Sequence, residues 1–282
     1  MLPPVVSVEW LQHHLEDERL IILDASLQKN QANLQTNITD LQIKGARFFD
    51  IKGVFSQQET TLPNMLISPE AFTSACQQLG IHKDSKMVIY DQLGVYSSPR
   101  AWWMFKCMGH DEVAVLDGGL PAWLAAGGCL EPLNRTPVHT KGNFMAKFRK
   151  DWVSSITEIV ENLETEAALL IDARSQQRFD GTVAEPRIGS RSGHIPKAVN
   201  LPFQNVLEDG KFKSKAALKS IFNTLGIEDK PLIFSCGSGV TASIVLLACE
   251  LVCTNPKAVY DGSWTEWGAS DYPIENKSTQ WN

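Results

Sequence analysis

The sequence predicts an α/β protein made of two copies of one domain, each a mostly parallel β-sheet with helices on both faces. Short apolar runs typical of buried strands alternate with longer segments typical of helices, which is the pattern of βα units. The order of these segments in the first half then recurs in the second half. A repeat this long indicates duplicated domains rather than a solenoid.

The elements of the first half each have the sequence signals of their type. Apolar runs of a few residues predict strands, and a Ser followed by an acidic residue or by Pro predicts a helix start. In chain order we expect a helix from Ser7, a strand at 20–23, a helix from Ser68, a strand at 86–91, a helix at 99–107, and a strand followed by a helix start over 113–123.

The second half repeats these segments in the same order. The matched segments are 169–174 with 21–26, 193–198 with 41–46, 231–235 with 87–91, and 259–267 with 115–123. The polar stretch that follows residue 130 contains Pro and Gly and has no clear period, which is typical of a linker. We therefore expect an N-terminal domain over 1–137, a linker over 138–151 and a C-terminal domain over 152–282.

Composition and charge restrict the classes of function. Hydrophobic residues make up 43% of the chain and charged residues 21%, the balance of a globular protein with a sizeable core. The formal net charge of −6 argues against a general affinity for nucleic acid. The N-terminus does not have the pattern of a signal peptide, and no apolar run approaches the length of a membrane span. We expect a cytoplasmic protein with no nucleic-acid or membrane partner.

The chain has six cysteines, none of them in Cys-x2-Cys spacing, and no cluster of histidines lies near them, so a zinc site is not expected. This cysteine usage fits a reducing compartment. We expect neither a metal nor an organic cofactor. Four cysteines lie in apolar helical patterns and are expected to be small core residues: Cys76, Cys107, Cys249 and Cys253.

The stretch around Cys236 combines a strand end, two glycines and a helix start. Residues 232–234 form a short apolar run typical of a buried parallel strand, and residues 240–252 are long and apolar enough for a buried helix. Gly237 and Gly239 allow a tight turn whose backbone N–H groups point inward. Together with the positive end of the helix dipole, this environment favours a thiolate. We therefore interpret Cys236 as a nucleophile rather than a buried structural thiol.

A cysteine-dependent phosphatase has a loop of similar shape, and it is the competing interpretation from the residues. That chemistry requires Cys-x5-Arg, because the arginine clamps the phosphate. The sixth residue after Cys236 is Ala242, so the sequence argues against it.

Four segments of the second half are similar, in their order, to the landmarks of the two-domain rhodanese, or sulfurtransferase, family. The segments are Asp172-Ala-Arg174, Gly193-His-Ile-Pro196, Cys236-Gly-Ser-Gly-Val-Thr241 and Asp261-Gly-Ser-Trp264. The resemblance spans nearly the whole chain, because both halves carry the pattern. Within the family, the uncharged loop resembles that of the 3-mercaptopyruvate sulfurtransferases, whereas thiosulfate sulfurtransferases typically carry basic residues there.

The resemblance implies a role for several residues of the second half. Cys236 takes up the sulfur as a persulfide, and Ser238 orients or polarises the substrate. Arg178 and Arg187 hold the substrate carboxylate, and a guanidinium suits that task because it can grip a carboxylate at two points. For Thr241, capping of the helix start is an equal alternative to substrate contact. The remaining substrate-binding residues implied by the loop are Gly237, Gly239 and Val240.

The expected activity is therefore transfer of sulfur from 3-mercaptopyruvate, through a cysteine persulfide, to a thiol or to cyanide, with release of pyruvate. The acceptor is a thiol or dithiol, with a thioredoxin-like protein as one candidate. Two alternatives stay open: a thiosulfate sulfurtransferase, and a non-catalytic sulfur carrier or binding protein with the same tandem fold. Asp91 or Gln92 stands in the first domain where Cys236 stands in the second, so we expect the first domain to be inactive.

The chain departs from the family pattern at Gln42. Many mercaptopyruvate enzymes have His-Ile-Pro-Gly there, and that His has been proposed as a relay to the loop Ser; a glutamine cannot act as a general base. We therefore expect no relay through Gln42. Either water or another group protonates the pyruvate enolate, or Gln42 has only a hydrogen-bonding role. Asp24, Asp172 and His194 are interpreted as structural, and Arg191 as a surface residue.

Overall fold

The computed structural model describes residues 2–29, 34–135 and 138–277. The chain forms two compact units. The first comprises Met1–Gln58, Leu66–Arg149 and Glu208–Phe212, and the second comprises Glu59–Met65, Lys150–Leu207 and Lys213–Asn282.

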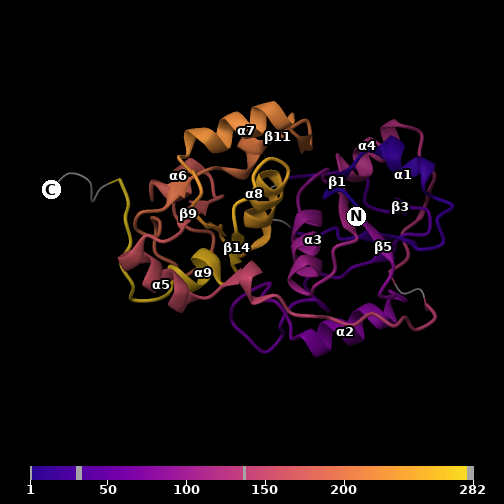
Figure 1. Ribbon diagram of the computed structural model, residues 1–282, viewed down its shortest axis with the longest axis horizontal. Coiled ribbons are helices and arrows are strands. Elements are labelled where there is room, and N and C mark those ends of the chain that lie inside the picture. The colour runs from indigo at the N-terminus through magenta and orange to yellow at the C-terminus, as the bar shows by residue number, and fades with distance from the viewer. Residues whose placement is uncertain (1, 30–33, 136–137, 278–282) are drawn as a thin grey trace. The chain divides into compact units, whose positions relative to one another are not determined.

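The first unit is built on a five-stranded parallel sheet with the strand order β1-β6-β5-β2-β4. Helices α1 and α4 lie on one face of this sheet and α2 and α3 on the other (Figure 1). The strands are β1 Val5–Val6, β2 Leu20–Asp24, β4 Arg47–Phe48, β5 Lys86–Tyr90 and β6 Val113–Leu116, and the helices are α1 Val8–His13, α2 Pro69–Gln78, α3 Ser98–Cys107 and α4 Gly119–Ala125.

The second unit repeats this architecture strand for strand, with the order β8-β14-β13-β9-β10 and parallel pairing throughout. Helices α5 and α9 lie on one face of the sheet and α7 and α8 on the other (Figure 1). The elements are β8 Val153–Ser154, α5 Ile156–Thr165, β9 Leu169–Asp172, α6 Gln176–Phe179, β10 Val199–Asn200, α7 Lys215–Thr224, β13 Leu232–Ser235, α8 Val240–Glu250, β14 Lys257–Tyr260 and α9 Ser263–Trp267. The matching strand orders confirm the predicted duplicated α/β fold.

Six short elements complete the architecture of the described residues. The 3-10 turns are η1 Lys150–Trp152 and η2 Phe203–Val206, and the strands β11 Leu207–Glu208 and β12 Lys211–Phe212 pair with each other. In addition, β3 Leu41–Ile43 pairs antiparallel with β7 Leu130–Pro132. The sequence gives no sign of this last pairing, because the start of the predicted polar stretch has no strand periodicity.

Helix α8 is buried nearly all round, which fixes the loop that precedes it. Its residues from Ala242 to Cys249 are all inaccessible to solvent, as expected of a helix that is apolar on every side. Each large aliphatic side chain buried in this way contributes roughly 1.5–3 kcal/mol. On the opposite face of the sheet, Trp264 and Trp267 of α9 pack into a second core cluster. The carboxyl end of β13 is therefore held from both sides.

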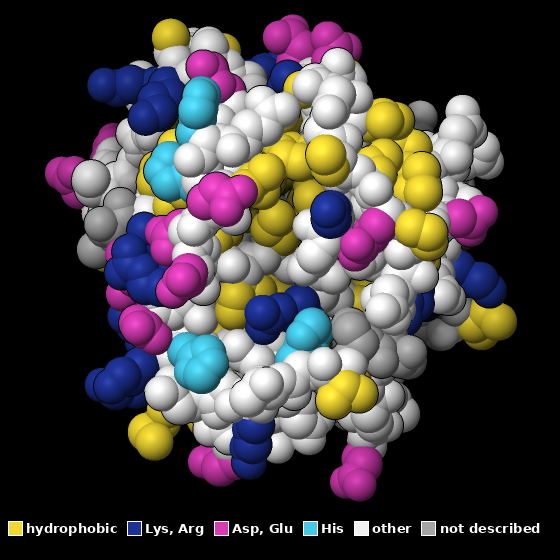
Figure 2. Space-filling model, turned by 90° about the vertical axis from the view of Figure 1, so that its right-hand side faces the viewer, with side chains coloured by type: hydrophobic (Ala, Val, Ile, Leu, Met, Phe, Trp, Pro, Cys, Tyr) yellow, Lys and Arg dark blue, Asp and Glu magenta, His cyan; other side chains and the backbone are white. Residues whose placement is uncertain are grey.

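The cysteines expected in the core are largely buried. Cys76, Cys107 and Cys249 are buried, whereas Cys253 is half-buried and Cys129 is exposed. Among the described residues, none of the helices combines the length and apolar character that crossing a membrane requires. On the face drawn in Figure 2, Lys and Arg side chains are interspersed with Asp and Glu rather than gathered into one basic surface.

Candidate active site

Cys236 lies immediately after the last residue of β13, as the sequence predicted, and α8 begins four residues later at Val240. Gly239 is the N-cap residue and has a φ of 79°, a left-handed conformation that a glycine adopts without steric cost. The Cys236 residue is only 2% exposed, so its sulfur lies at the bottom of the turn rather than on the surface.

The start of α9 supports the Cys236 turn from outside. The backbone N–H of Cys236 donates to Ser263 Oγ at 3.3 Å, and the Trp264 N–H donates to the Cys236 carbonyl at 2.9 Å. The N–H and the hydroxyl of Thr265 both donate to the Gly237 carbonyl, at 3.0 and 2.6 Å. Ser263 itself has a φ of 51°, which is uncommon for a residue with a side chain. These bonds hold the carbonyl side of the turn against α9.

The amide side of the turn is left open for an anion. No acceptor for the backbone N–H of Gly237 or Ser238 occurs in the described part of the chain. The N–H groups of Val240 and Thr241, in the first turn of α8, have no partner within the helix. Because such N–H groups and the helix dipole favour negative charge, the turn can stabilise a sulfur anion. Thr241 does not cap the helix, since the cap position belongs to Gly239.

Ser238 is held by a residue that the sequence did not single out. The side-chain Nδ2 of Asn64 lies 3.1 Å from the Ser238 carbonyl oxygen and 3.0 Å from Ser238 Oγ. Both residues are buried and belong to the second unit. The two positions are 174 residues apart in the chain, and only the folded structure brings them together.

Arg174, at the end of β9, is the centre of a buried ionic cluster. Its guanidinium is inaccessible to solvent and binds Asp172 through Nε and Nη2, at 3.0 and 2.6 Å. Nη1 donates to Glu185 at 2.9 Å, and the guanidinium carbon lies 4.2 Å from the centre of the Trp264 ring. Burial works to lower the pKa of Arg174, but the two carboxylates hold that pKa above its usual value.

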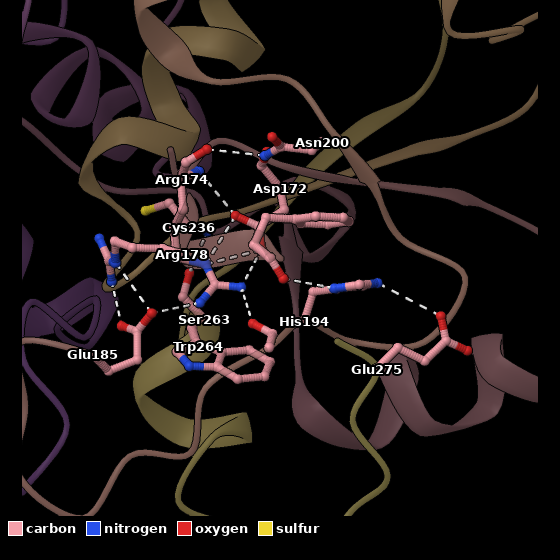
Figure 3. Close-up of polar contacts among 12 residues, drawn as sticks. Asp172, Arg174, Arg178, Glu185, His194, Asn200, Cys236, Ser263, Trp264 and Glu275 are labelled. Carbon is pink, nitrogen blue, oxygen red and sulfur yellow. Dashed lines mark hydrogen bonds and ion pairs between the residues drawn. The ribbon is translucent and has the colours of Figure 1, made fainter. Parts of the chain in front are cut away.

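Glu185 joins this cluster to the two arginines expected at the substrate. Its nearly buried carboxylate accepts from Arg174 and also, through both oxygens, from Nε and Nη2 of Arg178 on α6. In Figure 3, the Cys236 side chain is directed to the same side of the cluster as the Arg178 guanidinium.

Arg187 differs from Arg178. Its guanidinium has no hydrogen bond or ion pair in the described part of the chain. Burial and the neighbouring charge of Arg178 lower the pKa of Arg187. An unpaired, partly desolvated cation next to a second arginine attracts an anion, so these two side chains form a candidate carboxylate site.

The residues interpreted as structural have structural contacts. His194 stacks on Phe179 at 3.7 Å between ring centres, and its Nδ1 lies 2.8 Å from the Phe179 carbonyl. A carbonyl oxygen only accepts, so Nδ1 carries the proton. Arg191 is more than a surface residue, because it donates to the carbonyls of Trp267, the last residue of α9, and of Gly268 and Tyr272 beyond it.

Gln42 is buried in the first unit, and its amide is fully used there. Nε2 donates to the Ala46 carbonyl at 3.0 Å and to Glu131 at 2.8 Å, and Oε1 accepts from the Asn134 N–H at 2.9 Å. These contacts fit the hydrogen-bonding role expected of this side chain.

Comparison with known proteins places both halves in one family. The model of the rhodanese-like domain matches residues 7–126 and again residues 155–270. The chain belongs to the rhodanese-like family. The two matched regions contain all strands of the two parallel sheets except the edge strands β1 and β8, and the second region contains Cys236 and the arginine cluster.

Rhodanese-like relatives match almost the full length of the chain. The protein named 3-mercaptopyruvate sulfurtransferase from Escherichia coli (strain K12) is 38% identical over 275 residues, which cover 96% of this chain and 97% of the relative. The protein of the same name from Homo sapiens is 38% identical over 274 residues, covering 93% and 91%.

Solved structures agree with the sequence comparison. The crystal structure of SseA from Escherichia coli, described as a 3-mercaptopyruvate sulfotransferase, has a TM-score of 0.79 and 36% identity, over 93% of this chain and 98% of that chain. The Tum1 protein from Saccharomyces cerevisiae has a TM-score of 0.86 and 27% identity, over 97% and 98%.

Proposed function

We propose that this rhodanese-like protein is a sulfurtransferase whose Cys236 takes sulfur from 3-mercaptopyruvate and passes it to a thiol. The observation that carries the proposal is the open amide side of the Cys236 turn in the same unit as the Arg178 and Arg187 pair. The names of two relatives that match nearly the full length of the chain support this donor.

In the first step, the Cys236 thiolate attacks the sulfur of 3-mercaptopyruvate. A sulfur–sulfur bond forms, the carbon–sulfur bond breaks, and its electron pair stays on carbon as the enolate of pyruvate, which is then protonated. The N–H groups of Gly237, Ser238 and the first turn of α8 stabilise the sulfur anion, as hydrogen-bond donors do for oxyanions. Arg178 and Arg187 hold the carboxylate.

In the second step, an acceptor thiolate attacks the outer sulfur of the Cys236 persulfide, which restores the Cys236 thiolate. Cyanide serves as an acceptor in an assay. A dithiol acceptor, such as a thioredoxin-like protein, then releases the sulfur as it closes its own disulfide. We assign this cycle to the C-terminal domain over 152–282, with the domain over 1–137 inactive and 138–151 as the linker, in a protein of the cytoplasm.

The charge of the arginine cluster supports a donor with one negative charge. Three arginines, at 174, 178 and 187, face two carboxylates, Asp172 and Glu185, so the cluster has one excess positive charge. The carboxylate of 3-mercaptopyruvate neutralises that charge, whereas thiosulfate has two negative charges. The Cys236 turn also has no basic side chain to compensate for a second charge.

The proposal is tested by the mass of the intact protein after incubation with 3-mercaptopyruvate. We expect wild type to gain one sulfur atom, Cys236→Ser to gain none, and Cys129→Ser, which alters an exposed thiol, to behave as wild type. A wild-type protein without a sulfur adduct contradicts the proposal.

Steady-state measurements separate the alternatives. A larger kcat/KM with thiosulfate than with 3-mercaptopyruvate assigns the protein to thiosulfate transfer. A persulfide that forms once but is not turned over by thiols or cyanide indicates a sulfur carrier instead.

A further inference from the structure

Asn64 faces Ser238 with the nitrogen of its amide. The backbone carbonyl of Ser238, 3.1 Å from Nδ2, can only accept a hydrogen bond, so the group that faces it must be the NH2 rather than the oxygen. The same nitrogen lies 3.0 Å from Ser238 Oγ. The NH2 therefore donates one hydrogen to the Ser238 carbonyl and the other to the Ser238 hydroxyl oxygen.

This arrangement determines whether the Ser238 hydroxyl donates or accepts a hydrogen bond at the substrate. Its oxygen accepts from Asn64, so its own hydrogen must be donated elsewhere. In the described part of the chain, Ser238 Oγ donates to no acceptor. A primary amide neither takes up nor releases a proton at neutral pH, so Asn64 cannot deprotonate Ser238. The Ser238 hydroxyl is consequently a hydrogen-bond donor and not a base or a nucleophile.

We propose that Asn64 is a positioning residue that holds the Ser238 hydroxyl as a donor to the keto oxygen of the substrate, where negative charge develops. The inference rests on the proposed function, because enolate formation requires an α-keto donor. In that reaction the carbon–sulfur electron pair becomes the carbon–carbon double bond of the enolate while the carbonyl π pair moves onto the keto oxygen, so a donor aimed at this oxygen stabilises the transition state. Removal of one such donor typically costs about 10²–10³-fold in rate.

The geometry around Asn64 favours aspartate as the probe substitution. Asn64 has a φ of 59°, and aspartate is one of the few residues with a side chain that tolerate this conformation. Asn64→Asp keeps the shape but replaces the NH2 by an acceptor. The Ser238 hydroxyl then donates to the new carboxylate and is lost to the substrate.

The test measures the rate at which Cys236 gains sulfur in a single turnover, from two donors. We expect Asn64→Asp and Ser238→Ala each to slow sulfur uptake from 3-mercaptopyruvate about 30-fold or more. Uptake from thiosulfate, whose sulfur–sulfur cleavage forms no enolate, should change less than about threefold in Ser238→Ala. Asn223→Asp adds the same charge on an exposed position of α7 and should match wild type.

The double variant Asn64→Asp with Ser238→Ala shows whether Asn64 acts through Ser238. We expect its rate with 3-mercaptopyruvate to lie within about threefold of the slower single variant. Multiplied effects in the double variant, an equal loss with both donors in Ser238→Ala, or an unchanged rate in Asn64→Asp overturns the inference. Failure of the proposed function is distinct, because then wild type itself gains no sulfur.

Discussion

The loops after β5 and β13 occupy equivalent places in the two units, but their backbone amides bind different partners. In the first unit, Oδ2 of the buried Asp91 accepts from the N–H groups of Tyr96, Ser97 and Ser98, each at 2.9 Å. In the second unit Cys236 stands in place of the aspartate, and the N–H groups of Gly237 and Ser238 have no acceptor among the described residues. The first loop thus supplies its own side-chain acceptor for these amides, whereas the second leaves amides that can receive an anion from a substrate.

The carboxyl ends of the neighbouring strands, β2 and β9, also differ between the two units. Asp172 is the last residue of β9 and is bound by the buried Arg174, whereas Asp24 is the last residue of β2 and has Ser26 where the second unit has Arg174. Burial raises the pKa of Asp24. The duplicated framework is the same, and the difference lies in which side chains meet the carboxyl ends of the strands.

Replacement of Arg174 should give the largest loss of unfolding free energy among the variants considered. In Arg174→Met, Asp172 and Glu185 lose their shared cation while they remain buried, which costs about 3–5 kcal/mol of unfolding free energy. The equivalent change in the first unit, Ser26→Ala, removes a neutral hydroxyl and should cost about 1 kcal/mol. Urea unfolding measures both. Equal losses would show that the arginine cluster is not a stabilising difference between the units.

The two loops can be compared directly by alanine substitution. Asp91→Ala leaves the donors of the first loop unpaired, and we expect a loss of about 2–4 kcal/mol with transfer activity retained in the folded fraction. Cys236→Ala should cost about 1 kcal/mol and abolish activity. Denaturation curves and activity assays of the two variants should therefore show opposite patterns. An Asp91→Ala protein as stable as wild type would contradict the view that the first loop depends on the Asp91 side chain as its acceptor.

Glu185→Gln tests the charge balance of the second unit. The excess positive charge of the cluster rises by one, which favours a dianion over a monoanion. We expect the ratio of kcat/KM for thiosulfate to that for 3-mercaptopyruvate to rise about tenfold, or about 1.4 kcal/mol. Glu166→Gln removes an exposed carboxylate that pairs with Lys197 and serves as the control. An unchanged ratio would mean that this cluster does not select the donor.

The smallest expected effect is the contribution of Asp24 to the pH dependence of the unfolding free energy. Because burial raises its folded pKa, the folded state binds a proton more tightly than the unfolded chain does. The stability of wild type should therefore decrease relative to Asp24→Asn as pH rises from the unfolded carboxyl pKa, about 3.9, through the raised folded pKa. The difference in unfolding free energy, measured by urea at a series of pH values, should be about 1 kcal/mol or less. A difference that does not vary with pH would argue against a raised Asp24 pKa.

Features that depend on local sequence were predictable. The turn at Cys236 follows from an apolar run, two glycines and an apolar helix within about a dozen residues, and the repeat identified the equivalent strands. The contact of Asn64 with Ser238 and the junction at Glu185 were not predictable, because they join residues whose meeting depends on tertiary packing. The contacts of Asp91 were also missed, since a single aspartate after a strand has no sequence sign of the amides that it will accept.

Trp264 contacts both the Cys236 turn and the arginine cluster. Its backbone N–H binds the Cys236 carbonyl, and its ring packs against Arg174, which is linked through Glu185 to Arg178. A displacement of α9 is thus transmitted both to the sulfur and to the carboxylate site. A descendant enzyme that evolves a new donor must change this helix together with the turn, and directed evolution should begin there.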